Sequence, residues 1–369
     1  MLRFLSICCS LLILASCTGA LGKPSASNQL SKAQCSDPGV DPALLVTQLA
    51  KRKKFPGIAV AVAYGDNRTW SHGSGFAEIA SASPIQPRST KFRIGSTSKS
   101  LTAFLLARLA QLKKIDLDQS VRESLTELPQ AYDGVTLRQL AGHLGGVRHY
   151  ASQAELGNTI TYRSSEDALT IFVEDPLVAS PGSEFNYSTY GYTLISAVLE
   201  RELGLGFLSI MSNEVFAPLQ MDHTLADTSQ IQPPDRTEFY YLNEEGEPII
   251  GPEIDNSNKW AGGGFLASVV ELARFGKAHF DDGLLSKETR DTLWTSQNTS
   301  TGEATEYGMG WFVEDGWVEH PGGALGGSTL LRIYPDQELV IAMSANLSVL
   351  GEGRFDELPD QLFECFSRN

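Results

Sequence analysis

The alternation of hydrophobic and polar residues predicts strands near both ends of the chain and helices in its middle. An amphipathic helix is predicted over residues 41–54, followed by strands over 58–64 and 68–79 that the turn Gly65-Asp66-Asn67 joins. Towards the C-terminus, three further strands and a final helix are predicted, at 308–313, 328–334, 339–345 and 355–366. Because one sheet must pair the strands from both ends, we expect two intertwined subdomains.

The segments between these strands are mostly helical. Residues 101–112 are apolar on nearly every side, which predicts a helix buried on most of its faces. Further helices are predicted at 137–143 with Thr136 as its cap, at 166–173, at 192–203, and at 269–280 with Ser268 as its cap. Within a single domain at 41–369, we therefore predict an α/β part at about 41–115 and 259–369 and a helical lobe at about 116–258.

The N-terminal segment predicts export. Arg3 precedes a short apolar run, which is typical of a signal peptide at residues 1–16. The run ends in Leu14-Ala15-Ser16-Cys17, which resembles a bacterial lipobox and implies cleavage before Cys17 and lipidation of that cysteine. An ordinary signal peptide cut near Ala20 is the alternative. Residues 17–40, rich in Ser, Ala, Gly and Pro, are predicted to be a flexible tether that keeps the domain near a membrane of the bacterial envelope, on its periplasmic or extracellular face.

The composition bears on binding partners and on the state of the cysteines. The net charge of −15 argues against nucleic-acid binding, because phosphate contacts require Lys and Arg. The one basic run, Lys51-Arg52-Lys53-Lys54, is interpreted as the solvated end of the first helix. Once the signal peptide is removed and Cys17 is lipidated, Cys35 and Cys365 remain. An oxidising compartment permits a disulfide between them, and two buried free thiols are the alternative.

Three short motifs suggest the chemistry. They are Ser96-Thr97-Ser98-Lys99 at a predicted helix start, Tyr187-Ser188-Thr189 on a turn beside a helix, and His320-Pro321-Gly322 on a strand flanked by glycine. Each motif is weak alone. Together they predict the active site of a serine acyl-transfer enzyme.

Ser96 and Lys99 are three residues apart, so they lie on one face of a helix. A serine hydroxyl is a weak nucleophile that needs a base nearby, and Lys99 is placed to be that base. Backbone N–H groups at the helix start would also face a developing negative charge. Ser96 is therefore predicted to be the nucleophile; a simple helix cap is the alternative.

With these motifs the chain resembles the serine beta-lactamase and penicillin-binding-protein superfamily, in particular its class C branch with the related esterases and peptidases. Within that branch it looks most like the mitochondrial serine beta-lactamase-like proteins. The matching stretches span roughly residues 55–347 and are 92–99, 140–146, 181–192, 262–265 and 320–323. The resemblance implies an α+β fold, in which an antiparallel sheet flanked by terminal helices stands beside an all-helical lobe. It also implies that the terminal helices share one face of the sheet, which would bring Cys35 and Cys365 close together.

The resemblance also implies roles for individual residues. Tyr187 would take the serine proton, with a neighbouring cation lowering the pKa of its phenol. His320 stands where the family has a lysine and would assist the proton network around Tyr187. The backbone N–H of Gly323 would complete an oxyanion hole with that of Ser96. Thr189 and Gly322 occupy substrate-binding positions. A structural tyrosine and a strand-edge histidine remain the alternatives for Tyr187 and His320.

The chain departs from the family pattern in ways that bear on substrate. Thr189 replaces the asparagine of Y-x-N, and His320-Pro321 replaces the Lys-Thr of K-T-G. Efficient penicillin hydrolysis is therefore not expected, and His143 in Gly142-His143-Leu144 is interpreted as structural. No G-x-S-x-G motif and no metal-binding His or Cys spacing is present, and no cofactor is expected. The leading hypothesis is a membrane-tethered serine hydrolase acting through an acyl-enzyme on esters, amides or peptides. A true beta-lactamase or D-Ala-D-Ala carboxypeptidase, and a non-catalytic binding or sensing module, are the alternatives.

Overall fold

The computed structural model describes residues 40–65, 68–349 and 354–367. All of these residues belong to one compact unit, residues 34–369. Within the described ranges, no helix has the length and apolar character needed to cross a bilayer. The predicted signal peptide, the lipidation of Cys17, the tether up to residue 39 and the thiol of Cys35 lie outside the described residues.

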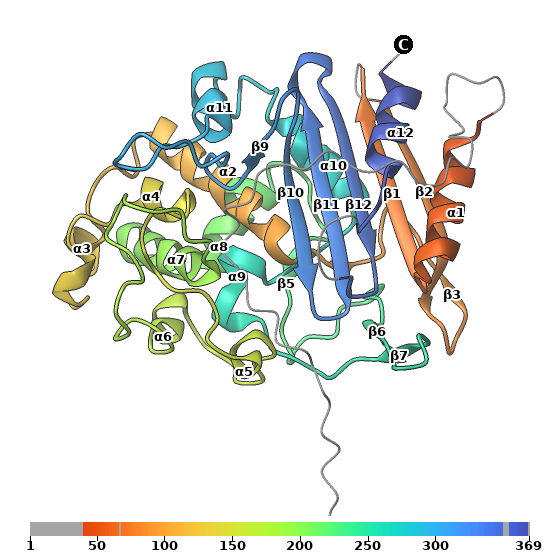
Figure 1. Ribbon diagram of the computed structural model, residues 1–369, viewed down its shortest axis with the longest axis horizontal. Coiled ribbons are helices and arrows are strands. Elements are labelled where there is room, and N and C mark those ends of the chain that lie inside the picture. The colour runs from red at the N-terminus through yellow and green to blue at the C-terminus, as the bar shows by residue number, and fades with distance from the viewer. Residues whose placement is uncertain (1–39, 66–67, 350–353, 368–369) are drawn as a thin grey trace, which may run out of the picture. The chain divides into compact units, whose positions relative to one another are not determined.

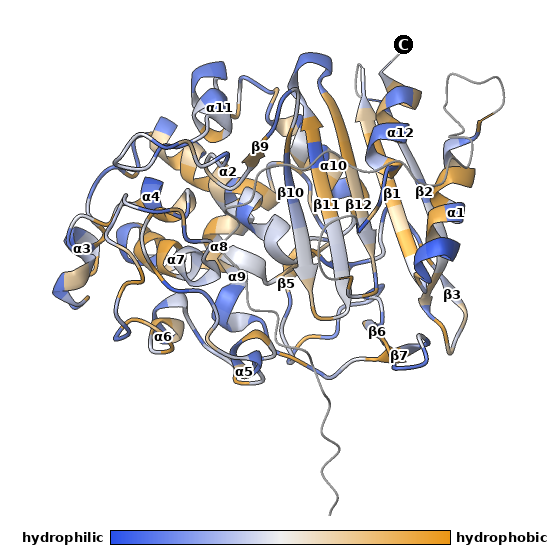
Figure 2. Ribbon diagram, viewed as in Figure 1, coloured by the Kyte–Doolittle hydropathy of each residue, from blue (hydrophilic) through white to orange (hydrophobic). Residues whose placement is uncertain are grey.

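A seven-stranded antiparallel sheet forms the centre of the α/β part (Figure 1). Its order is β3-β2-β1-β12-β11-β10-β9. The bounds are β1 Gly57–Tyr64, β2 Arg68–Glu78, β3 Ser83–Pro84, β9 Phe312–Val313, β10 Val318–Ala324, β11 Gly327–Tyr334 and β12 Leu339–Ala345. Because Ile58 of β1 pairs with Ala345 of β12, strands from the two ends of the chain lie side by side, as the hydrophobic pattern predicted. Both strands are hydrophobic and buried along nearly their whole length (Figure 2).

The two terminal helices, α1 (Pro42–Lys53) and α12 (Leu358–Phe366), pack against one face of this sheet (Figure 1). Asp41 caps α1, since its side chain accepts from the backbone N–H of Ala43. The basic end of α1 is at the surface, where Arg52 and Lys53 form ion pairs with Asp356. Cys365 in α12 is disulfide-bonded. Its pairing with Cys35 stays a prediction, because Cys35 lies outside the described residues.

The other face of the sheet packs on the helical part of the molecule. The helices there are α2 Ser98–Gln111, α3 Val121–Ser124, α4 Leu137–Ala141, α5 Gln153–Leu156, α6 Ser165–Leu169, α7 Thr189–Leu203, α8 Phe207–Met211, α9 Trp260–Gly263, α10 Val269–Ala278 and α11 Lys287–Trp294. Two small sheets complete the fold: β4 (Phe92–Arg93) with β8 (Phe265–Ala267) and β5 (Leu225–Ala226), and the hairpin β6 (Tyr240–Leu242) with β7 (Pro248–Ile250). Helix α2 is central, and nearly all its side chains are buried. The predicted α+β class is confirmed.

Most predicted elements are present with small shifts at their ends, and the expected caps of α4 and α10, Thr136 and Ser268, accept from the backbone as predicted. One strand is much shorter than predicted. Residues 308–313 contribute only Phe312–Val313, because Gly310 turns with a φ of +74° directly against α2. A Cβ at Gly310 would lie 2.8 Å from the carbonyl oxygen of Lys99, so this segment covers the helix that carries Lys99 instead of extending the sheet.

Candidate active site

Ser96 lies in a tight turn, residues Gly95–Thr97, that leads directly into α2. Strand β10 packs on this turn backbone to backbone. A Cβ on Gly322 would lie 1.9 Å from the carbonyl oxygen of Ile94, and a Cβ on Gly95 would lie 2.4 Å from that of Gly323. Only glycine permits this approach. The packing places Gly323 beside Ser96, as the predicted oxyanion hole requires, whereas Gly322 is buried and faces the turn. The roles of both glycines towards substrate stay predictions.

Lys99 is completely buried one turn after Ser96. Its Nζ lies 3.2 Å from Oγ of Ser96, 3.1 Å from Oγ1 of Thr189 and 2.6 Å from the carbonyl oxygen of Gly262. The spacing of three residues therefore brings the amine and the hydroxyl together, as predicted. The carbonyl of Gly262, in α9, was not anticipated from the sequence as a ligand of Lys99.

The charge of Lys99 is governed by its surroundings. Burial, and secondly the positive charge of Lys259, hold the pKa of Lys99 well below its ordinary value. Lys259 is itself buried, and its Nζ donates to the carbonyl oxygen of Leu156 at 2.5 Å. Burial lowers the pKa of Lys259 to about 7. The site thus holds an amine that gives up its proton readily.

Tyr187 is placed with Ser96 and Lys99, but its ionisation differs from the prediction. Burial raises the pKa of its phenol, and a hydrogen bond with Ser96 only partly opposes this. The Nζ of Lys99 lies 4.8 Å from the centroid of the Tyr187 ring. The expectation of a phenolate favoured by a neighbouring cation is therefore wrong, because the neighbouring lysine is desolvated and is not a persistent cation. Tyr187 is a neutral phenol.

His320 is buried in β10 and faces Tyr307. Its Nε2 lies 2.9 Å from the Tyr307 hydroxyl and its Nδ1 lies 2.8 Å from the carbonyl oxygen of Pro321. Because that carbonyl can only accept, Nδ1 carries the proton and Nε2 accepts from Tyr307. Burial lowers the pKa of His320 to about 3, so the ring is neutral. Both ring nitrogens of His320 are bonded to these partners. The predicted assistance to Tyr187 would therefore not use a direct hydrogen bond from His320, and the centroids of the two rings are 6.4 Å apart.

The segment 143–150 holds the Tyr187-Ser188-Thr189 motif in place. Nδ1 of His143 accepts from the backbone N–H of Ser188 at 3.1 Å, which supports the structural interpretation of His143. Nδ1 of His149 accepts in the same way from Thr189, also at 3.1 Å. Thr189, which is buried, also shares a hydrogen bond with the hydroxyl of Tyr150. Thr189 therefore orients the amine of Lys99 through their hydrogen bond. A contact between Thr189 and the substrate stays a prediction.

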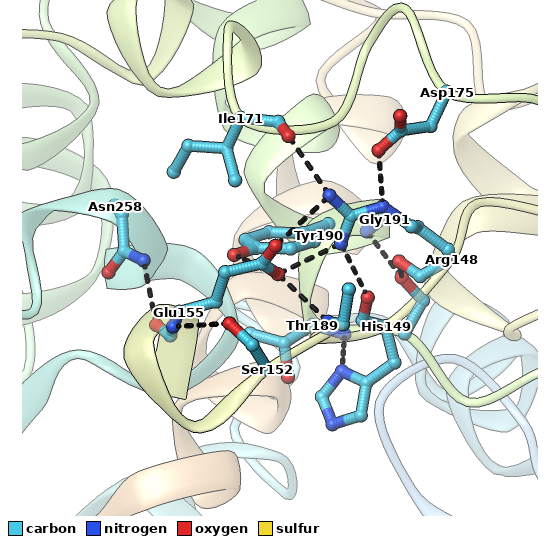
Figure 3. A network of polar contacts seen from close by, with 12 residues as sticks. Arg148, His149, Ser152, Glu155, Ile171, Asp175, Thr189, Tyr190, Gly191 and Asn258 are labelled. Atoms are coloured by element: carbon cyan, nitrogen blue, oxygen red, sulfur yellow. Dashed lines mark hydrogen bonds and ion pairs between the residues drawn. The ribbon is translucent and has the colours of Figure 1, made fainter. Parts of the chain in front are cut away.

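A charged network holds this segment in place (Figure 3). Arg148 forms ion pairs with Glu155 at 2.9 Å and with Asp175 at 2.6 Å, and it donates to the carbonyl oxygen of Ile171. The hydroxyl of Tyr190, in α7, donates to Glu155 at 3.0 Å. The network ties the segment that carries His149 to the first turn of α7. The network was not predicted from the sequence, because its members are brought together from separate segments of the chain.

A buried ion pair anchors the other side of the site. Nε of Arg93, three residues before Ser96, lies 2.6 Å from Oδ2 of Asp227, and both side chains are almost fully buried. The guanidinium of Arg93 also donates to the carbonyl oxygen of Leu325 at 2.9 Å, in the turn between β10 and β11. One arginine therefore links the approach to Ser96 with the end of the strand that carries Gly323. Among the described residues, no group of three or more His, Cys, Asp or Glu side chains is arranged to hold a metal ion.

Comparisons with known proteins bear on the family and the fold of the chain. A family model described as Beta-lactamase matches residues 43–362. The chain is 30% identical over 380 residues to the Serine beta-lactamase-like protein LACTB, mitochondrial, of Homo sapiens, which covers 76% of this chain and 69% of the human protein. It is 25% identical over 330 residues to a Beta-lactamase of Escherichia coli (strain K12), covering 88% of this chain and 80% of that protein. The crystal structure of a penicillin binding protein from Bacillus halodurans superposes with a TM-score of 0.73 at 22% identity, covering 86% of this chain and 98% of that one.

Proposed function

The chain belongs to the beta-lactamase family, and on this basis we propose that it hydrolyses an ester or amide bond through an acyl-enzyme on Ser96. Membership of this family supports a serine beta-lactamase-like hydrolase as the general class of the protein. The mechanism and the substrate type are proposed here from the arrangement of Ser96, Lys99 and Tyr187.

The observation that carries the proposal is the set of acceptors around Lys99. A neutral amine has two N–H groups and one lone pair. The carbonyl oxygen of Gly262 can only accept, and Oγ1 of Thr189, which can pass its own proton to Tyr150, accepts the second N–H. The lone pair is then directed at the third neighbour, the hydroxyl of Ser96 at 3.2 Å. This is the arrangement that a general base requires.

Catalysis would proceed in two stages. In acylation, Lys99 takes the proton of Ser96 while Oγ attacks the carbonyl, and the backbone N–H groups of Ser96 and Gly323 stabilise the oxyanion. Tyr187 is a proton donor here, since its phenol is neutral, and it protonates the departing oxygen or nitrogen. Deacylation reverses these roles with water as the nucleophile.

The surroundings of His320 favour an esterase or peptidase over an efficient beta-lactamase. The side chain that replaces the lysine of K-T-G is a neutral imidazole bonded to Tyr307, so it offers no charge to a penicillin carboxylate. A non-catalytic binding module is disfavoured, because a binder gains nothing from a desolvated lysine oriented at a serine. We further propose that the enzyme is exported and anchored through Cys17 in the bacterial envelope, on the grounds of the lipobox-like N-terminal sequence.

The test combines labelling with turnover. The purified protein is treated with a fluorophosphonate probe, and the labelled peptide is identified by mass spectrometry. Short-chain p-nitrophenyl esters, D-amino-acid peptides and nitrocefin are then compared as substrates. Label on Ser96, its loss together with turnover in Ser96→Ala, and slow nitrocefin hydrolysis are expected. Label on another serine, or turnover in the variant, would overturn the assignment.

A further inference from the structure

We propose that the outer edge of β2 pairs with the same strand of a second copy of this chain. The product is a two-fold symmetric dimer in which one sheet runs through both copies. This inference concerns an interaction surface and does not depend on the proposed hydrolase activity. It rests on the hydrogen-bonding pattern of β2 and on the residues that this strand presents at the edge of the sheet.

The first half of β2 has backbone groups that nothing in the described chain pairs. The N–H of Phe76 donates to the carbonyl oxygen of Pro56, so the even-numbered residues of β2 point their backbone groups towards β1. In an antiparallel strand the alternate residues then point outward. Thr69 and Ser71 therefore direct their N–H and C=O groups away from the sheet, and these four groups form no hydrogen bond with any described residue.

The second half of the same edge is protected. Sheets commonly block their edges with short strands, proline, bulges, lysine or a covering segment. Strand β2 pairs there with β3 (Ser83–Pro84), a two-residue strand that ends in proline, and the register shifts as in a bulge. Ile85 then donates to the carbonyl oxygen of Gly75. Residues 68–72, in contrast, read Arg-Thr-Trp-Ser-His and contain no lysine, proline or acidic side chain, so they have none of these defences against pairing.

The unprotected segment is complementary to itself. When two copies of residues 68–72 run antiparallel about Trp70, Thr69 of each copy lies opposite Ser71 of the other, and four backbone hydrogen bonds join the copies. The same register places the two Trp70 side chains opposite each other, at a position without hydrogen bonds where side chains approach most closely. Trp70 is half-buried, and its ring lies 5.3 Å from that of Phe366 in α12, which holds it at this face.

Charge and composition favour a second copy as the occupant. The net charge of −15 tends to keep two copies apart, but β2 has no acidic residue from Arg68 to Ala77, so carboxylates do not meet at this contact. The other candidate within the chain is the N-terminal stretch 17–40. Its Ser, Gly and Pro content predicts a flexible tether and disfavours a strand.

The symmetry of the contact is compatible with the proposed membrane anchor. Because the paired strands are antiparallel within one sheet, the two-fold axis is perpendicular to that sheet. Both copies then present α1 and α12 on the same side of the dimer, since these helices cover one face (Figure 1). Two tethers could therefore reach one membrane, and confinement there would raise the effective concentration of the copies. The Ser96 site, beside β10, is three strands away and stays open.

The first test measures association of the purified full chain by sedimentation velocity over a wide range of protein concentration. Ser71→Pro removes the N–H groups that would donate two of the four bonds between copies, and it breaks no bond within the described chain. Ser71→Ala is the matched control, because it keeps these N–H groups. We expect a reversible dimer whose dissociation constant rises about tenfold or more in Ser71→Pro and is unchanged in Ser71→Ala.

Two results would overturn the proposal. One is equal dimerisation of Ser71→Pro and Ser71→Ala. The other is a monomer at every concentration, which would leave this edge to the tether or to a different protein. Thermal unfolding of each variant shows whether it is folded.

The second test reads the register and needs no variant that disrupts the strand. Thr69→Cys and Ser71→Cys are prepared separately, mixed and mildly oxidised. In the proposed register the two introduced thiols face each other at a Cα separation of about 5.5 Å, which a disulfide spans. The mixture should form several-fold more covalent dimer than either variant alone. Ser81→Cys, an exposed position outside the free edge, should give only the wild-type background. A mixture that cross-links no more than the separate variants would refute the pairing.

Discussion

Replacing Gly322 with alanine should disable the site without touching any reacting group. The new Cβ would lie 1.9 Å from the carbonyl oxygen of Ile94 and 2.8 Å from Oγ1 of Thr97, where ordinary contacts are 3.4 Å or longer. Strand β10 and the Ser96 turn must therefore separate by about 1.5 Å. A misplacement of about 1 Å can cost roughly a hundredfold in rate, and overpacking typically costs about 1–3 kcal/mol of stability.

Gly323→Ala is the matched control on the same strand. Its nearest neighbour is the far end of the Arg354 side chain, at 3.1 Å, which can move aside, and its backbone N–H is kept. The assays are hydrolysis of the neutral ester p-nitrophenyl butyrate, fluorophosphonate labelling of Ser96, and thermal unfolding. We expect Gly322→Ala to lose about a hundredfold in kcat/KM and to unfold a few degrees lower, while Gly323→Ala loses far less. Equal activity and stability in the two variants would refute the argument that β10 positions the Ser96 turn.

Three further predictions concern groups around the site. The free amine of Lys99 exists above its lowered pKa and is lost as the pH falls through it, so hydrolysis should decline on the acid side. Lys259→Met removes a positive charge and should shift that acid limb to higher pH, and an unshifted pH–rate profile would contradict the coupling. Thr189→Val should lower kcat about five- to tenfold, the equivalent of one hydrogen bond, with Thr189→Ser largely retaining it. Asp227→Ala leaves Arg93 buried without its partner and should cost about 3–5 kcal/mol in urea unfolding; a change below 1 kcal/mol would show that the pair is not structurally required.

Local sequence patterns predicted most of the elements, because their physical cause is local. The nearly continuous apolar run of α2 predicts a helix that is buried on most of its faces, and side-chain caps such as Thr136 and Ser268 satisfy backbone donors within three residues. The contact between Ser96 and Lys99 was predictable for the same reason, since a spacing of three residues places both on one face of a helix. The shortened strand at 308–313 was not, because its turn at Gly310 depends on α2, two hundred residues earlier.

The chemistry of the individual groups required the tertiary structure. The sequence showed that a lysine, a tyrosine and a histidine were present in the right motifs, yet the ionisation assigned to Tyr187 was wrong and the partner of His320 was not anticipated. The first depends on the burial of the phenol by the surrounding fold, and the second on the side-chain contact with Tyr307.

The sequence by itself determined the class of fold, the order of its elements and the family, because hydrophobic periodicity and short motifs are written in consecutive residues. The tertiary structure alone decided the burial and the partners of Lys99 and Tyr187, on which their proposed roles as base and proton donor rest. The physical reason is that pKa values, ion pairing and close backbone packing are set by the atoms that surround a group in space. Burial and distance follow from the whole fold and are not encoded in any short segment.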